Sequence, residues 1–143
     1  MILNTIGFAG KSAEEFFTIL LNNNVLNLID IRLNNKSQLS SFTNLKHLPY
    51  FLNLHGIKYY YKPEYAPTKE LLDHYKNKNI DWKDYERLYN EILRERNIIK
   101  NIKWDFFDEA VLLCSEPTAE KCHRRLLAEF LAKENSSIKV RHL

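Results

Sequence analysis

The sequence predicts a three-layer, doubly wound α/β fold: a mostly parallel sheet of about five strands, with helices on both faces, in a single domain over residues 1–143. Three observations support this. Short apolar runs alternate with stretches of helical periodicity, which favours parallel strands joined by right-handed crossovers. One run, "EAVLLC" (109–114), is apolar almost throughout, as expected of a strand buried on both faces. With 143 residues, 45% hydrophobic and 27% charged, the chain has the size and composition of one globular domain.

The first half of the chain alternates strands with helices. "ILNTIGF" (2–8) is an apolar run that predicts the first strand. Ser12 and Glu15 then form an S-x-x-E capping box, which predicts a helix beginning after Ser12. "VLNLIDI" (25–31) predicts the second strand. A polar loop leads into a helical stretch over 48–55, which ends at Gly56 before "IKYYY" (57–61), the third strand.

The second half continues the alternation. Thr68 is a suitable N-cap for a short helix over 69–78, and Asp81 for a longer one that reaches about residue 103. The apolar residues of this longer helix recur at helical spacing, which indicates a face turned toward the core. The strand 109–114 follows, Thr118 is the expected N-cap of the next helix, and "SIKVRHL" (137–143) predicts a final strand.

Composition excludes several classes of protein. The longest uncharged apolar stretch, "FFTILLNNNVLNLI", is interrupted by asparagines and is too short to cross a bilayer, so we expect no membrane association. The N-terminus lacks the pattern of a signal peptide. Two cysteines do not make the disulfide framework of a small secreted protein, and we therefore expect a cytoplasmic protein.

Polar residues follow each predicted strand. In open parallel sheets, ligands bind in the crevice beyond the carboxyl ends of the strands. Those ends carry Gly7–Ser12, Asp30–Asn35 with Arg32 and Asn34, Glu64, and Cys114–Glu116. The sequence therefore predicts a Rossmann-like crevice lined by these segments.

The stretch after the fourth strand holds the candidate catalytic residues. On a helix capped by Thr118, Cys122 and His123 lie near the N-terminus and toward the crevice. A helix N-terminus lowers the pKa of a thiol and attracts anions, so we expect Cys122 to be the more reactive thiol, with Cys114 ending a buried strand. Glu116 is a candidate proton carrier, and Arg32 and Arg124 are candidates to grip an oxyanion. The structural alternatives are a buried hydrophobic Cys122 and a packed His123.

Other named chemistries fit the spacing less well. The two cysteines stand eight residues apart and lack the CxxC pairs of a structural zinc site; His123 supplies a third ligand, but no fourth is evident. We therefore expect no metal and no cofactor, and a fold that forms without metal. A phosphatase loop needs Arg six residues after Cys, where Glu120 stands, and "GFAGKS" is too short for a Walker loop. A Cys114–Cys122 disulfide is unneeded in a cytosolic protein.

The chain resembles a known family. The residues that carry the resemblance are "TIGFAGKSAEEF", "LIDIRLNNKSQLSSF", "GIKYYYKPEYAPTKELLDHYKNKNIDWKDYERLY" and "LLCSEPTAEKCHRRLLAEFL". Together they resemble the domain-of-unknown-function 488 family, in a branch with IDIR, APTKELL and C-x-E…CHR motifs. The resemblance implies an α/β fold with these motifs around one cleft, and it implies site roles for Arg32, Glu116, Cys122, His123 and Arg124, and for Thr68 and Lys69. Many relatives carry a histidine where Phe8 stands. The resemblance implies no reaction.

Three functions remain as hypotheses. The leading one is an enzyme-like domain whose polar cleft binds a small anionic, phosphate-bearing or nucleotide-like ligand, held by Gly7, Asp30, Arg32, Asn34, Thr68, Lys69 and Arg124. The second is a nucleic-acid-binding module, because six Lys or Arg face two Glu between Lys121 and Leu143; no nucleic-acid motif accompanies them. The third is a structural partner protein without catalysis. Convergence of the polar residues on an open cleft distinguishes the first hypothesis from the third.

Overall fold

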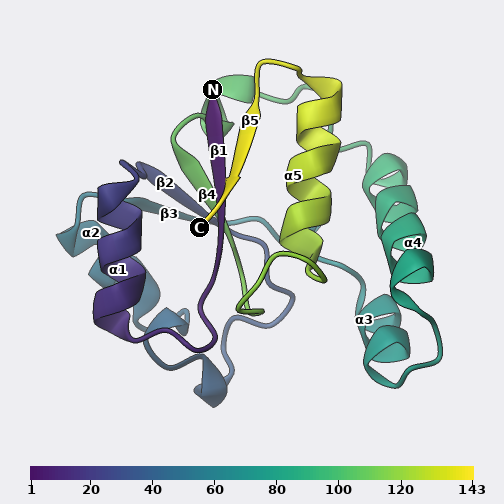
Figure 1. Ribbon diagram of the computed structural model, residues 1–143, viewed down its shortest axis with the longest axis horizontal. Coiled ribbons are helices and arrows are strands. Elements are labelled where there is room, and N and C mark those ends of the chain that lie inside the picture. Colours follow the sequence, from purple (N-terminus) through teal and green to yellow (C-terminus); the bar gives the residue numbers. More distant parts are fainter.

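The structure, a computed structural model, describes residues 1–143 and contains one five-stranded sheet (Figure 1). Its strands are β1 (Ile2–Gly7), β2 (Asn27–Asp30), β3 (Lys58–Tyr61), β4 (Ala110–Cys114) and β5 (Lys139–His142). All pairings are parallel, and the strand order is β3-β2-β4-β1-β5. The predicted number of strands is confirmed. The order sets β4 between β1 and β2, so that three polar carboxyl ends stand side by side.

Helices cover both faces of the sheet, which confirms the three-layer fold. In Figure 1, α1 (Ala13–Asn22) and α2 (Leu48–Leu54) lie on one side, and α3 (Lys69–Lys76), α4 (Trp82–Glu95) and α5 (His123–Glu134) lie on the other. Short 3₁₀ turns occur at Gln38–Thr43, Pro63–Tyr65 and Trp104–Phe107. Each helical layer encloses its own apolar core against the sheet.

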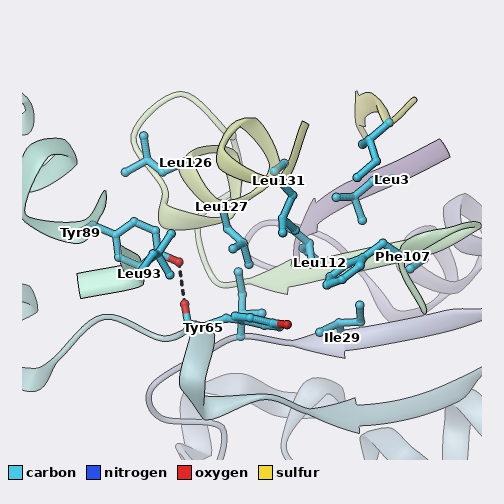
Figure 2. Packing of buried hydrophobic residues seen from close by; sticks show 14 of the residues in the cluster. Leu3, Ile29, Tyr65, Tyr89, Leu93, Phe107, Leu112, Leu126, Leu127 and Leu131 are labelled. Atoms are coloured by element: carbon cyan, nitrogen blue, oxygen red, sulfur yellow. Dashed lines mark hydrogen bonds between the residues drawn. The ribbon is translucent and has the colours of Figure 1, made fainter. Parts of the chain in front are cut away.

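Alternation along β4 separates these two cores. Ala110 and Leu112 join the cluster beneath α4 and α5, whereas Val111 and Leu113 join the cluster beneath α1 and α2. All five residues of β4 are buried, as the continuous apolar run predicts. Figure 2 shows Leu112 among the first cluster, beside Leu127 and Leu131 of α5. Since side chains alternate, Cys114 points to the same face as Leu112, toward α5.

The predicted helix starts are confirmed at three positions. Ser12 accepts from the Glu15 N–H and completes the capping box before α1. Thr68 caps α3 by accepting from the Leu71 N–H, and Asp81 caps α4 by accepting from the Asp84 N–H. These short-range bonds satisfy N–H groups that a helix leaves without partners, which is why the caps are visible in sequence.

The predicted end of α4 is wrong, because the helix ends at Glu95 and not near residue 103. Asn97 adopts a left-handed conformation with φ of 53°. The N–H of Asn97 donates to the Arg94 carbonyl and that of Ile98 to the Leu93 carbonyl, the two bonds of a Schellman motif. Asparagine tolerates this conformation better than most residues, so it replaces the glycine that usually marks such an end.

The predicted start of the last helix is also wrong. Residues 115–122 form turns, and α5 begins at His123 with Cys122 as its N-cap. The loop after β4 stays beside the loop after β1, where the N–H groups of Phe8 and Ala9 donate to the carbonyls of Cys114 and Ser115. A helix starting after Thr118 would carry position 124 about 9 Å along its axis. The later start keeps Arg124 in the first turn, where it bonds to the Glu116 carbonyl.

None of the five α-helices has the length and apolar character that a membrane span requires.

Candidate functional site

A cavity of about 520 Å³ opens at the carboxyl ends of β1, β2 and β4, as the sheet topology predicts. The loops after these strands form its floor, and α3, α4 and the start of α5 form its wall. Its lining includes polar, charged and aromatic side chains: Arg32, Asn34, Tyr75, Lys76, Trp82, Cys114, Glu116, Lys121, Cys122 and His123. Two other hollows, one beside Lys46 and one beside Lys103, lie away from these residues.

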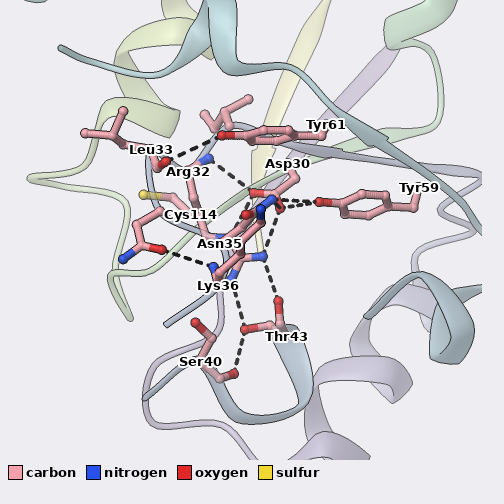
Figure 3. Close-up of polar contacts among 12 residues, drawn as sticks. Asp30, Arg32, Leu33, Asn35, Lys36, Ser40, Thr43, Tyr59, Tyr61 and Cys114 are labelled. Atoms are coloured by element: carbon pink, nitrogen blue, oxygen red, sulfur yellow. Dashed lines mark hydrogen bonds and ion pairs between the residues drawn. The ribbon is translucent and has the colours of Figure 1, made fainter. Parts of the chain in front are cut away.

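Arg32 is held in a buried ion pair with Asp30 (Figure 3). Its Nε donates to Asp30 Oδ1 at 2.8 Å and its Nη2 donates to Asp30 Oδ2 at 2.9 Å, a bidentate geometry. Further bonds reach the Thr43 hydroxyl and carbonyl. Arg32 is only 2% exposed, and Asp30 is fully buried. The structure therefore gives Arg32 the fold-stabilising pairing, and most of its donors are committed before any ligand arrives.

Asp30 has two further donors. The Tyr59 hydroxyl donates to Asp30 Oδ2 at 2.6 Å, and the Asn35 amide donates to the same oxygen at 3.3 Å. Burial raises the pKa of Tyr59, and its hydrogen bond to the Asp30 carboxylate raises it further. Asp30 thus connects β2 with β3 and with the loop that begins at Arg32. This role is structural, although the sequence placed Asp30 among the ligand-binding residues.

Cys114, Cys122 and His123 come together at the inner end of the cavity. Each offers one ligand atom, and the three atoms lie within 4.8 Å of one another. The Cys114 sulfur lies 3.5 Å from His123 Nδ1, and His123 Nε2 lies 2.8 Å from the Ile31 carbonyl oxygen. A carbonyl only accepts hydrogen bonds, so Nε2 carries the proton and Nδ1 faces the sulfur. Both cysteines are free thiols and buried.

The relative acidity of the two thiols contradicts the sequence argument. Burial raises the pKa of Cys122 well above its usual value, and the neighbouring Cys114 raises it further. Burial acts in the same direction on Cys114, but it is outweighed by the hydrogen bond from Cys122, the charge of Arg124, and the N–H groups of Ser115 and Glu116, so the pKa of Cys114 is lowered. Cys114 is therefore the more acidic thiol, chiefly because the Cys122 thiol donates a hydrogen bond to it.

Arg124 supports the loop after β4 from behind. It is 1% exposed, its Nη1 donates to the Glu116 carbonyl at 2.6 Å, and its Nε has no hydrogen-bond partner. Gly7 lies against the same contact: a Cβ on Gly7 would stand 1.5 Å from the Glu116 carbonyl oxygen. The side chain of Glu116 is exposed at the rim of the cavity. Gly7 and Arg124 thus shape the site, and neither lines the cavity itself.

A protein-family model described as "Domain of unknown function DUF488" matches residues 12–131. The chain belongs to this family. The matched span begins at the N-cap of α1 and ends within α5, so it includes β2, β4 and both cysteines of the cavity. No curated protein and no solved structure matches the chain.

Within this DUF488 domain, two of the predicted ligand-binding residues lie away from the cavity. Thr68 caps α3 and faces the groove between α3 and α4. Lys69 is 81% exposed and pairs with Asp73 at 2.6 Å. Asn34 does line the cavity, where its side-chain oxygen accepts from the Lys36 N–H. Of the residues to which the resemblance gives site roles, Arg32, Glu116, Cys122 and His123 line the cavity, whereas Thr68 and Lys69 do not.

Four further residues with chemistry suited to a ligand line the DUF488 cavity, and none of them was assigned to a site from the sequence. Lys76 and Lys121 line it as exposed cations that form no ion pair, and Tyr75 and Trp82 supply aromatic walls. Tyr75 and Trp82 pack edge to face, with ring centroids 5.6 Å apart. The helical spacing of Trp82 indicated a core-facing stripe, because one face of α4 both packs toward the sheet and ends at the cavity. Lys76 in the last turn of α3 gave no signal of its own.

Proposed function

We propose that this domain is an enzyme-like binding domain whose cavity takes a small ligand with a phosphate group and a flat ring, such as a nucleotide. The observation that carries the proposal is the lining of the cavity, which combines two unpaired lysines, Lys76 and Lys121, with the aromatic rings of Phe8, Tyr75 and Trp82. The ligand would lie beyond the carboxyl ends of β4 and its two neighbours, β1 and β2, the usual place for ligands in open parallel sheets.

The charges around the cavity support an anion. Lys76 and Lys121 contribute two positive charges from α3 and from the loop before α5. Glu116 is the one carboxylate in the lining, and the charge of Arg32 is balanced by Asp30. A phosphate oxygen accepting from a lysine forms a charge-assisted bond, contributing about 1.5–3 kcal/mol. Lys121 replaces Arg32 and Arg124 as the cation that we assign to the ligand.

The aromatic walls support a ring. Phe8, Tyr75 and Trp82 each keep part of their surface accessible, and all three line the cavity. Stacking of a base on an aromatic side chain contributes about 1–3 kcal/mol. A ligand that has both a ring and a phosphate would use the aromatic rings and the lysines, whereas phosphate alone would use only the lysines. Glu116, exposed at the rim of the cavity, is then the candidate to move a proton to or from the bound molecule.

Isothermal titration with phosphate, adenosine and adenosine monophosphate tests the proposal. We expect the nucleotide to bind more tightly than either of its parts. Lys121→Met should weaken nucleotide binding by roughly tenfold, because it removes one charged bond. Lys133→Met, near the far end of α5, is the matched control and should leave binding unchanged. Wild-type protein that binds neither phosphate nor the nucleotide would overturn the proposal.

The same titration distinguishes the nucleic-acid hypothesis. That hypothesis rests on the basic residues between Lys121 and Leu143. Two of them are not free to contact a phosphate backbone, because Arg124 is buried and Arg125 pairs with Glu129 at 3.0 Å. A nucleic-acid module would bind an oligonucleotide with steep salt dependence and would ignore the mononucleotide. That result would replace our proposal. The cytoplasmic location predicted from cysteine content remains part of it.

A further inference from the structure

We propose that Cys114, Cys122 and His123 bind one Zn²⁺ ion at the carboxyl end of β4. From the sequence, three potential zinc ligands were found, one fewer than a structural zinc site requires. A structural zinc site uses four protein ligands, but a catalytic zinc site uses three and keeps one position open. The spacing between the cysteines is also no obstacle, because the loop 115–122 folds back and brings Cys122 next to the strand end.

The distances suit a tetrahedral ion. Zn–S and Zn–N bonds of about 2.3 and 2.1 Å at tetrahedral angles hold a sulfur and a nitrogen about 3.6 Å apart. The Cys114 sulfur and His123 Nδ1 stand 3.5 Å apart. The remaining pairs of the three ligand atoms fall within 4.8 Å, so the ion would draw Cys122 inward by at most about 1 Å.

His123 is already oriented as a metal ligand. Its Nε2–H donates to the Ile31 carbonyl at 2.8 Å, so the ring is held in one tautomer with the Nδ1 lone pair toward the sulfurs. Metal-binding histidines commonly donate their second N–H to a carbonyl or carboxylate, which fixes the ring and strengthens the ligand. The ring also packs edge to face on Tyr89, with centroids 5.8 Å apart. The ligand is thus positioned from two sides.

Charge and access are consistent with the ion. Two thiolates and one neutral imidazole balance the charge of Zn²⁺, so a buried zinc complex at this place carries no net charge. All three ligands line the cavity of about 520 Å³, so a fourth ligand would reach the ion from that space. Soft sulfur ligands favour zinc over magnesium or calcium, which prefer oxygen. The inference concerns the metal alone and stands whether or not the cavity binds a nucleotide.

Titration of the reduced, metal-free protein with Co²⁺ reports the site directly. We expect one equivalent of cobalt to give the charge-transfer band of thiolate–cobalt bonds and the intense visible bands of tetrahedral cobalt, both abolished by one equivalent of Zn²⁺. Zinc should also raise the thermal midpoint, since it binds the folded chain. The metal-free protein should remain folded, because its two apolar cores form without the ion.

Variants identify the ligands. Cys122→Ser and His123→Asn should each weaken cobalt binding by more than about tenfold, since even loss of an outer contact costs about 10- to 100-fold. His55→Asn, an exposed histidine whose ring contacts the Phe51 carbonyl, is the matched control and should bind normally. Wild-type protein without a saturable thiolate–cobalt band overturns the proposal, whichever variants fold. Normal binding by His123→Asn excludes the three-ligand site.

Discussion

At the scale of single residues, the site depends on contacts that hold the loops in place. Arg32 and Asp30 stand two residues apart in sequence, yet they form a bidentate pair because the chain turns sharply after β2. Arg124 holds the loop after β4 by one bond to a carbonyl, and Gly7 leaves room for that contact. These residues shape the cavity without touching a ligand in it. Substitutions at these positions should therefore affect stability before they affect binding.

Arg32→Met should lower the free energy of unfolding by about 3–5 kcal/mol, because it leaves the buried Asp30 carboxylate without its partner. Urea denaturation measures the change. Arg87→Met is the control: Arg87 pairs with Asp84 and Glu91 on the exposed face of α4, and its loss should cost less than about 1 kcal/mol. A stable Arg32→Met protein that fails to bind phosphate would instead make Arg32 a ligand residue.

Gly7→Ala should destabilise the fold by about 3 kcal/mol or more, because the new methyl group overlaps the Glu116 carbonyl and crowds Arg124 Nη1 at 2.7 Å. Thermal melts followed by circular dichroism measure the effect. The control is Gly10→Asn, since Gly10 has φ of 76° with open space around it and asparagine tolerates that conformation. Equal melting points for the two variants would show that the loop can move away at no cost.

At the scale of elements, the helix layer beside the cavity is tied to the sheet by few polar bonds. Tyr89 of α4 is fully buried and donates its hydroxyl to the Tyr65 carbonyl at 2.6 Å (Figure 2). Tyr65 belongs to the short 3₁₀ turn after β3. The bond therefore connects the wall of the cavity to the strand that carries Tyr59. It fixes how far α4 stands from the sheet.

Tyr89→Phe should lower the free energy of unfolding by about 1–3 kcal/mol, because the buried Tyr65 carbonyl loses its donor and gains no water. Tyr50→Phe offers the matched control: Tyr50 is 64% exposed, and its change should stay within about 0.5 kcal/mol. Chemical denaturation of both variants decides the matter. A loss no larger than that of Tyr50→Phe would mean that the carbonyl finds another donor.

At the scale of the whole molecule, buried tyrosines give the fold an alkaline limit. Burial raises the pKa of Tyr65 to about 12, with the Glu64 charge adding to it. Burial also raises the pKa of Tyr85 and of Tyr89. The phenols ionise near pH 10 in the unfolded chain. Because the pKa values are higher in the folded protein, the neutral buried tyrosines contribute their full stabilisation below pH 10. This contribution is lost as the pH rises through the folded pKa values.

We therefore expect the thermal midpoint to fall progressively between pH 10 and pH 12. Melting curves across this range, together with phenolate absorbance, test the expectation. In the native protein the absorbance should rise in two stages, the second coinciding with unfolding. Tyr85→Phe should make the fall in midpoint less steep. A midpoint that does not change up to pH 12 would contradict the argument.

Much of the fold could be predicted because its signals are local. The capping residues Ser12, Thr68 and Asp81 and the apolar run 109–114 act over four to six residues, and each appears as predicted. Two helix boundaries were not predicted. Asn97 ends α4 in a left-handed conformation that asparagine tolerates but does not require, so its signal in the sequence is weaker than that of a glycine. The start of α5 is accompanied by the bond from Arg124 to the Glu116 carbonyl, which spans more residues than a helix cap.

The candidate site, too, could be predicted only in part. The place of the cavity follows from strand topology alone, and Glu116, Cys122 and His123 lie in it as the sequence predicts. The hydrogen-bond and ion-pair partners of each residue do not follow from the strand topology. That Arg32 binds Asp30, and that Cys114 is the more acidic thiol, depends on turns whose geometry the residue types leave open. Lys121 was overlooked because it lies in a loop that the sequence assigned to a helix.

The position of β1 has a consequence for how the chain is made. On the ribosome β1 emerges first, yet its two neighbours, β4 and β5, are synthesised last; Thr5 bonds to His142, 137 residues later. Leu3 and Ile6 therefore stay without strand partners during most of synthesis. Pairings so distant in sequence also close slowly. β1 therefore cannot pair before β4 has been made, and its outer edge stays open until β5 follows.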